Sequence, residues 1–208
     1  MKYNELKQKI KQLPVFFSSM LKASEKKGTL KVQFSQWKKK GLISQLRKGL
    51  YILSKDEREI EPTHFFLANQ IFIPSYISLE SALAFYGLIP EFVANTTSIT
   101  SRKTCKFKNE FGIFTYQHIK KEGYDGFISI REKDNISILI ATPEKALVDF
   151  VYLNLEKFNL QDISVLTESY RFQNYEKLSK KKIRQYALNL QSKKLVLVLE
   201  LLMKEVLK

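Results

Sequence analysis

The stretch that decides the fold of the first quarter of the chain is residues 29–53, which read TLKVQFSQWKKKGLISQLRKGLYIL. Apolar side chains recur at helical spacing at Leu30, Phe34 and Trp37, which predicts a helix over residues 29–40 that Thr29 caps. Two short apolar runs follow it, separated by a basic turn that contains a glycine, and this pattern predicts a β-hairpin.

The residues on either side complete the pattern. Helical spacing and capping residues predict two earlier helices, over residues 2–13 and 18–25. The hairpin strands are expected over residues 42–46 and 50–53, with Arg47-Lys48-Gly49 as the turn. Three helices followed by a basic hairpin is the element order of a winged helix-turn-helix.

The sequence therefore predicts an α+β protein with an N-terminal winged helix-turn-helix domain over residues 1–55. The polar, mostly acidic residues 56–62 are expected to form a linker. Residues 63–208 are expected to form a larger mixed α+β domain with a helical C-terminal end. Its predicted helices cover 64–71, 78–85, a segment beginning at Thr142-Pro143-Glu144, 162–170, 179–190 and 192–207, and its predicted strands cover 97–100, 104–107, 113–118, 127–131 and 136–140.

Charge is concentrated at the two ends of the chain. The 208 residues hold 35 Lys and Arg against 21 Asp and Glu, a formal net charge of +14. Residues 1–55 hold 14 basic and 2 acidic side chains, and residues 170–208 hold 10 basic and 3 acidic. A strong positive field on one small module favours a polyanionic partner, although a lysine-rich solvated surface would give the same composition.

Several classes of protein are excluded by composition. With 1 cysteine and 2 histidines, the chain can form neither a disulfide scaffold nor a Cys/His zinc site. Its N-terminus has no apolar segment typical of a signal peptide, and the apolar run Leu195–Leu199 is far too short to span a membrane. We expect a cytoplasmic protein without a membrane partner.

The helix over residues 29–40 has the two faces that a recognition helix needs. One face would pack on the earlier helices, and the other would offer amide, hydroxyl and small apolar groups to base edges, with lysines for phosphates. A solvated face of a protein-interaction module remains the alternative. The predicted DNA-binding residues are Lys31, Val32, Gln33, Ser35, Gln36, Lys38, Lys39, Lys40, Arg47 and Lys48.

Two sets of side chains could support catalysis. Cys105 with His64 or His118 could form a nucleophile and base, but no activating motif surrounds the cysteine. The carboxylates of Glu80, Glu144 and Asp149 could hold Mg²⁺, but a capping or surface role accounts for each. We therefore expect no catalytic residue, no metal and no cofactor.

Four motifs in order resemble the AbiEi-type antitoxin and transcriptional regulator family, over about residues 1–190. They are GLISQLRKGLYIL (Gly41–Leu53), YISLESALAFYGLIPE (Tyr76–Glu91), FGIFTYQHI (Phe111–Ile119) and ATPEKALVDFVYL (Ala141–Leu153). The matching positions are Gly49, Tyr51, Ser81, Gly87, Leu88, Glu144, Leu147 and Asp149. Gly49, Gly87, Glu144 and Asp149 also have structural interpretations as turn, cap or loop-holding residues, which we favour.

The resemblance implies an N-terminal domain that binds operator DNA and represses its own operon. It also implies a C-terminal domain that counteracts a co-encoded nucleotidyltransferase-type toxin without a stable complex. We expect the operator to contain inverted repeats. The alternative is a stand-alone winged-helix regulator whose C-terminal domain dimerises or senses a ligand.

A second basic cluster lies near the C-terminus. It is either a solvated face or a surface for antitoxin action, which would engage an acidic toxin or the RNA that the toxin modifies. The final helix, residues 192–207, is apolar nearly all round, so we expect it to be buried or to dock on another subunit. The cluster consists of Lys180, Lys181, Lys182, Arg184, Lys193 and Lys194.

Overall fold

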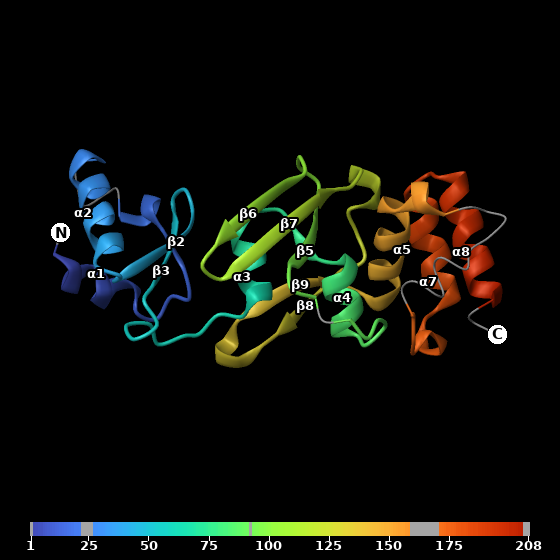
Figure 1. The fold of residues 1–208 in the computed structure, drawn as a ribbon, viewed down its shortest axis with the longest axis horizontal. Helices are drawn as coiled ribbons and strands as arrows, with labels where there is room; N and C mark the ends of the chain where they lie inside the picture. Colours follow the sequence, from blue (N-terminus) through green and yellow to red (C-terminus); the bar gives the residue numbers. More distant parts are fainter. Residues whose placement is uncertain (1, 22–26, 92, 159–170, 206–208) are drawn as a thin grey trace.

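The chain forms two β-sheets, with helices packed beside each of them and further helices at the C-terminal end. The computed structural model describes residues 2–21, 27–91, 93–158 and 171–205. The N-terminus and the C-terminus lie at opposite ends of an elongated molecule (Figure 1). The prediction of an α+β protein is confirmed.

The first part of the chain contains a three-stranded antiparallel sheet in the order β1-β3-β2, with helices on one face. Its helices α1 and α2 bury Leu6, Ile10, Leu30, Phe34 and Trp37 in a shared core. The elements are α1 (Tyr3–Ile10), β1 (Phe16–Phe17), the 3-10 helix η1 (Ser18–Leu21), α2 (Lys27–Lys39), β2 (Ile43–Arg47) and β3 (Leu50–Leu53).

Three predicted boundaries in this part need correction. Helix α1 ends at Ile10, three residues before its predicted end. Helix α2 begins at Lys27, so Thr29 lies inside the helix rather than at its N-cap. The predicted helix over residues 18–25 is a 3-10 turn in its described half, Ser18–Leu21, and its remainder lies outside the described residues. The hairpin strands are displaced from their predicted positions by at most one residue at any end.

Strand β3 is buried on both faces. Tyr51 and Leu53 contact the core under α1 and α2. Leu50 and Ile52 alternate with them and belong to the core of the second part of the chain. The side-chain amide of Asn109 also donates to the Leu46 carbonyl across the junction, at 3.1 Å. The small sheet therefore lies between two cores.

The acidic segment over residues 56–62, predicted as a linker, packs along α1. Glu57 forms an ion pair with Lys7, and Glu59 forms one with Lys11 at 2.9 Å. The Glu59 amide also donates to the Lys11 carbonyl at 3.3 Å. These contacts hold the segment against the first part of the chain.

Arg58 holds the same segment from the other side. Its guanidinium donates to the Leu53 carbonyl at 3.1 Å and to Glu61 at 2.8 Å, and it lies 5.6 Å from the centre of the Phe111 ring. The segment thus makes specific contacts with both parts of the molecule.

The second part of the chain contains a six-stranded mixed sheet in the order β6-β7-β5-β4-β9-β8. The pairs β5–β7 and β4–β9 are parallel and the other neighbours are antiparallel. The two-residue strand β4 was not predicted, and the other strands lie within one or two residues of their predicted positions. The strands are β4 (Tyr76–Ile77), β5 (Thr96–Thr100), β6 (Cys105–Asn109), β7 (Gly112–His118), β8 (Phe127–Arg131) and β9 (Ser137–Ala141).

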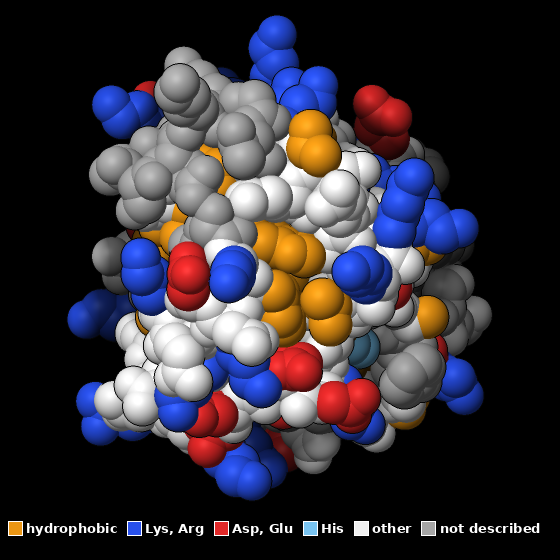
Figure 2. All heavy atoms as spheres, turned by 90° about the vertical axis from the view of Figure 1, so that its left-hand side faces the viewer, with side chains coloured by type: hydrophobic (Ala, Val, Ile, Leu, Met, Phe, Trp, Pro, Cys, Tyr) orange, Lys and Arg blue, Asp and Glu red, His pale blue; other side chains and the backbone are white. Residues whose placement is uncertain are grey.

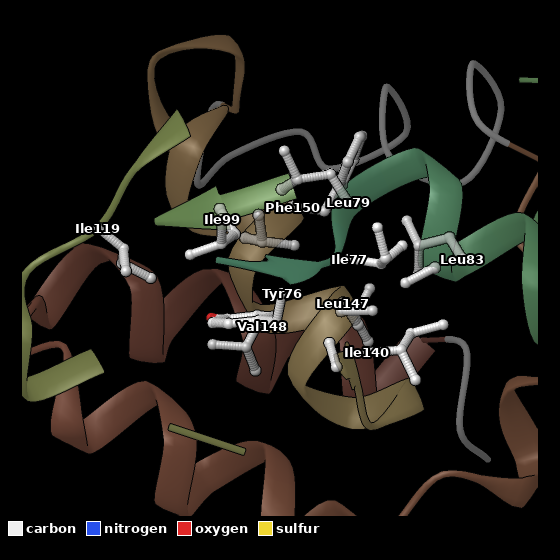
Figure 3. Close-up of a cluster of buried hydrophobic side chains, with 14 of the residues drawn as sticks. Tyr76, Ile77, Leu79, Leu83, Ile99, Ile119, Ile140, Leu147, Val148 and Phe150 are labelled. Atoms are coloured by element: carbon white, nitrogen blue, oxygen red, sulfur yellow. The ribbon is translucent and has the colours of Figure 1, made fainter. Parts of the chain in front are cut away.

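Helices α3 (His64–Ile71), α4 (Leu79–Phe85) and α5 (Pro143–Leu153) pack against this sheet. Thr142 caps α5 as predicted, because its side chain accepts a hydrogen bond from the Lys145 amide. Figure 3 shows side chains from β4, α4 and α5, including Tyr76, Leu83 and Leu147, meeting in one cluster. This cluster is the main core of the protein.

Helices α7 (Lys180–Asn189) and α8 (Lys193–Glu205) pack on α5 at the C-terminal end (Figure 1). Ile183 and Ala187 of α7 and Leu190 just after it are buried on the inner side of this helix. Helix α8 buries its inner face in the protein but leaves Leu197 49 % exposed. The predicted helix over residues 162–170 lies outside the described residues. Among the described helices, none has the length and apolar character needed to cross a membrane.

The two-faced packing of β3 predicts that the protein unfolds as one unit. Leu50 is fully buried, so Leu50→Ala should lower the free energy of unfolding by about 2–5 kcal/mol. Val32 is 57 % exposed, and the control Val32→Ala should change it by less than about 0.5 kcal/mol. Urea unfolding followed by fluorescence and circular dichroism tests this. Two separate transitions, with only one shifted by Leu50→Ala, would contradict it.

Candidate nucleic-acid interface

The outer face of α2 is exposed and polar. Phe34 and Trp37 lie beneath it in the core, and Val32 is the one large apolar side chain that α2 leaves mainly in solvent among its described side chains. The burial predicted from the sequence is confirmed along this helix. The exposed predicted residues are Lys31, Val32, Ser35, Gln36, Lys38, Lys39 and Lys40, while Gln33 is half-buried.

A groove of about 590 Å³ separates α2 from the turn between β2 and β3. The aromatic rings of Phe34 and Tyr51 form its base, and the centres of the two rings lie 4.5 Å apart. Lys31 and Lys38 line the helix side and Lys48 lines the turn side. Hydroxyl and amide groups of Ser18, Ser35 and Gln45 complete the lining. The groove thus combines an apolar base with donors and cations at its walls.

Two contacts fix the shape of this groove. The Lys38 ammonium donates to the side-chain carbonyl of Gln45 at 2.7 Å, which ties the end of α2 to β2. The Ser18 amide donates to the Gly49 carbonyl at 2.9 Å, which ties η1 to the turn. Burial raises the pKa of Tyr51. Its hydroxyl, like that of any tyrosine at neutral pH, is protonated and can donate a hydrogen bond.

In the part of the chain that the structure describes, the lysines of this face form no ion pair. The acidic segment neutralises Lys7 and Lys11 of α1. Within the described ranges, no ion pair joins Lys31, Lys48 or the three lysines at the end of α2 to a carboxylate. Figure 2, which views the end of the molecule where α1 and α2 lie, shows a central strip of hydrophobic side chains bordered by lysine and arginine side chains, with some aspartate and glutamate side chains among them.

Arg47 differs from the other predicted DNA-binding residues. It is half-buried, and its guanidinium lies 5.8 Å from the centre of the Phe17 ring. It also donates to the Lys48 carbonyl at 3.2 Å. Arg47 therefore stabilises the turn through these contacts, and Lys48 is the exposed cation at its tip.

Three hydrogen-bonding side chains of the groove are not among the predicted DNA-binding residues: Ser18, Gln45 and Tyr51. Ser18 comes from the segment before α2 and reaches the groove because η1 packs against the turn. Gln45 and Tyr51 are paired neighbours on β2 and β3, so strand alternation places them on the face toward α2. That alternation was the only signal that could have indicated them.

The second basic cluster is exposed but partly paired. Nε of Arg184 lies 3.8 Å from a carboxylate oxygen of Glu200. Nζ of Lys182 lies 3.9 Å from a carboxylate oxygen of Glu144. The Lys194 ammonium donates to the Leu155 carbonyl at 2.7 Å. Lys181 and Lys193 are exposed and have no ion pair among the described residues. The cluster therefore carries less free charge than its sequence indicates.

The candidate nucleophile and base do not form a hydrogen-bonded pair among the described residues. Nδ1 of His118 bonds the Arg102 carbonyl at 2.9 Å. Burial raises the pKa of the Cys105 thiol, although Arg102 opposes part of the rise. A raised pKa lowers the thiolate fraction that a nucleophile needs.

The candidate metal-binding carboxylates are also separate. No group of three His, Cys, Asp or Glu side chains that could hold a metal ion occurs in the described ranges. Glu144 accepts a hydrogen bond from the Ser179 amide at 3.2 Å, just before α7. The expectation that it serves the amides of its own helix is corrected, since Thr142 does so.

Asp149 is fully buried in a hydrogen-bond network. Its carboxylate pairs with Lys145 and accepts hydrogen bonds from Ser78 at 2.8 Å and Tyr76 at 3.0 Å. Burial raises the pKa of Asp149, and these three partners counteract part of the rise. Ser78 is the N-cap residue of α4, but its hydroxyl bonds Asp149 instead of an amide of that helix. The network joins α5 to β4.

Comparison of the sequence with protein-family models and with curated proteins finds no match.

The buried network predicts a large loss of stability when its charge is removed. Asp149→Asn leaves the fully buried Lys145 ammonium with only the carboxylate of Asp125, 3.9 Å away, as a counter-charge, which should lower the free energy of unfolding by about 3–5 kcal/mol. The control Glu122→Gln, at an exposed carboxylate, should change it by less than about 0.5 kcal/mol. Chemical denaturation measures both. Equal effects of the two substitutions would contradict the structural role of Asp149.

Proposed function

We propose that the first part of the chain is a winged helix-turn-helix that binds double-stranded DNA through α2 and the β2–β3 turn. The observation that carries this proposal is the positive charge along the exposed face of α2, which no carboxylate pairs with among the described residues, beside a groove lined with hydrogen-bonding groups. The order of helices and strands in residues 3–53 supports it. A partner with regularly spaced phosphates and base edges satisfies both features.

Each part of the interface has a distinct task in this proposal. Val32, Ser35 and Gln36 lie exposed on α2, where they offer an apolar contact for a thymine methyl and hydrogen bonds for base edges in the major groove. Lys48 at the turn and the lysines that end α2 contact phosphates, which position the helix without reading sequence.

We also propose, from the family resemblance, that the chain represses its own operon and acts as an antitoxin against a nucleotidyltransferase-type toxin. The exposed cations Lys181 and Lys193 are the residues of the second basic cluster best placed to meet a partner, because their charges are unpaired in the described structure.

The DNA-binding proposal predicts a steep salt dependence. With about 6–10 phosphate contacts from two copies on an inverted repeat, affinity for the DNA upstream of the gene should fall about 10³–10⁵-fold between about 50 and 200 mM salt. Fluorescence anisotropy with that DNA and a scrambled duplex measures it. Binding that does not change with salt would contradict the electrostatic contribution.

Substitutions should separate base contacts from phosphate contacts. Gln36→Ala should weaken operator binding by about 1–3 kcal/mol and leave scrambled DNA unaffected, if Gln36 reads a base. Lys48→Ala should weaken both duplexes alike and reduce the salt slope by about one contact. Lys121→Ala, at an exposed lysine of the second part, is the matched control. The same pattern for Gln36 and Lys48 would contradict the assigned groove contacts.

A growth assay tests the antitoxin proposal. Lys181→Glu with Lys193→Glu changes the local charge by four without breaking a described ion pair, so the protein should fold but lose protection against its toxin. Lys120→Glu with Lys121→Glu makes the same charge change at exposed positions outside the cluster and should retain protection. Full protection by both variants would contradict the antitoxin role of the second cluster and indicate that it is only a solvated face.

A further inference from the structure

An open cavity of about 700 Å³ lies at the end of the six-stranded sheet, where β5, β6 and β7 meet the end of α3. Its described lining contains three basic side chains, two hydroxyl groups and one aromatic ring, and no carboxylate. These residues are Phe72, Ser101, Arg102, Lys103, Thr104 and His118. We infer that this cavity, which we call the β5–β6 basin, binds a phosphate group.

The backbone of the basin is held from several sides. The Thr100 hydroxyl donates to the Pro74 carbonyl at 2.7 Å and accepts from the Arg102 amide at 3.1 Å. The His118 amide donates to the Thr104 hydroxyl at 3.0 Å. The loop over residues 101–104 is therefore fixed at both ends by side-chain hydrogen bonds. A fixed loop binds a ligand with little loss of conformational entropy.

Arg102 is oriented before any ligand arrives. Its guanidinium lies 5.0 Å from the centre of the Phe72 ring and donates to the Ile73 carbonyl at 3.1 Å. These two contacts occupy one of the five N–H donors and one face of the planar group. The remaining donors are available for a phosphate, which a guanidinium bonds in a bidentate manner.

His118 adds a second oriented group. Its Nδ1 lies 2.9 Å from the Arg102 carbonyl, and because a carbonyl oxygen only accepts, Nδ1 carries the proton. The exposed Nε2 then accepts from a protonated phosphate oxygen or, once protonated, donates to an ionised one. Lys103, exposed and without an ion pair among the described residues, supplies further positive charge.

The donor set indicates a phosphate rather than a carboxylate or a cation. Three basic side chains and two hydroxyls around one cavity match the several oxygens and the higher charge of a phosphate monoester or diphosphate. The lack of a lining carboxylate excludes a cation as the preferred occupant. The basin is separate from the groove beside α2, so this inference does not rest on the proposed DNA binding.

A phosphate group at this position has two possible sources, a free phosphorylated small molecule or the backbone of a nucleic acid. Amide spectra of the ¹⁵N-labelled full chain, titrated with inorganic pyrophosphate at constant ionic strength, test the site itself. The amides of residues 101–104 and 118 should shift and saturate. Arg102→Gln should weaken this binding at least about tenfold, since it removes charged hydrogen bonds.

Two further variants keep the test sharp. Lys103→Gln removes the positive charge of a side chain that has no described contacts, so it should weaken pyrophosphate binding and leave the spectrum otherwise native. Lys106→Gln, on the neighbouring strand but outside the basin lining, should bind pyrophosphate as the unmodified protein does. Shifts that do not saturate, that sodium chloride reproduces, or that survive Arg102→Gln unchanged would overturn the phosphate site.

Competition distinguishes the two sources. A single-stranded oligothymidylate that saturates the same amides at lower concentration than pyrophosphate would assign the basin to a nucleic-acid backbone. Pyrophosphate binding that the oligonucleotide does not displace would assign it to a small phosphorylated ligand. Both results support the site. The α2 amides report the proposed DNA interface separately, so failure of either proposal is visible without the other.

Discussion

The side chains of strand β3 point alternately into the two hydrophobic cores, and this alternation joins the two parts of the chain. Leu50 and Ile52 are buried against the second part of the chain, while Tyr51 and Leu53 pack under α1 and α2. Removing either neighbour would expose a row of apolar side chains to water, at about 25 cal/mol for each Å². The helix α2 and the turn beside it are therefore held in a fixed orientation relative to the six-stranded sheet.

The distribution of charge follows from the same packing. The acidic segment 56–62 runs along α1 because Glu57 and Glu59 pair with its lysines. That pairing leaves the positive charge of the first part concentrated on α2 and the β2–β3 turn. A segment that reads as a linker thus also determines which face of the protein presents a net positive field to a polyanion.

Local patterns in the sequence predicted the elements well. The spacing of Leu30, Phe34 and Trp37 identified the buried face of α2, and Thr142 followed by Pro143 marked the start of α5. Such features depend on neighbours within a few residues, so they are visible in the sequence.

Contacts between distant residues could not be predicted in this way. The contacts of the Arg47 guanidinium with the Phe17 ring and the Lys48 carbonyl are of this kind. The β5–β6 basin forms because Phe72, which precedes the loop over residues 101–104 in the sequence, and His118, which follows it, both lie beside that loop in the fold. Helical and strand periodicity relates only residues that are close in the sequence, so it does not indicate contacts between such distant positions.

Hydrogen–deuterium exchange of the full chain, with and without the DNA upstream of its gene, tests the central claim most directly. The account predicts slower exchange on DNA binding along α2 and in the turn around Lys48 and Gly49, with α7 and α8 unchanged. Protection confined to α7 and α8, with α2 exchanging as in the free protein, would contradict it.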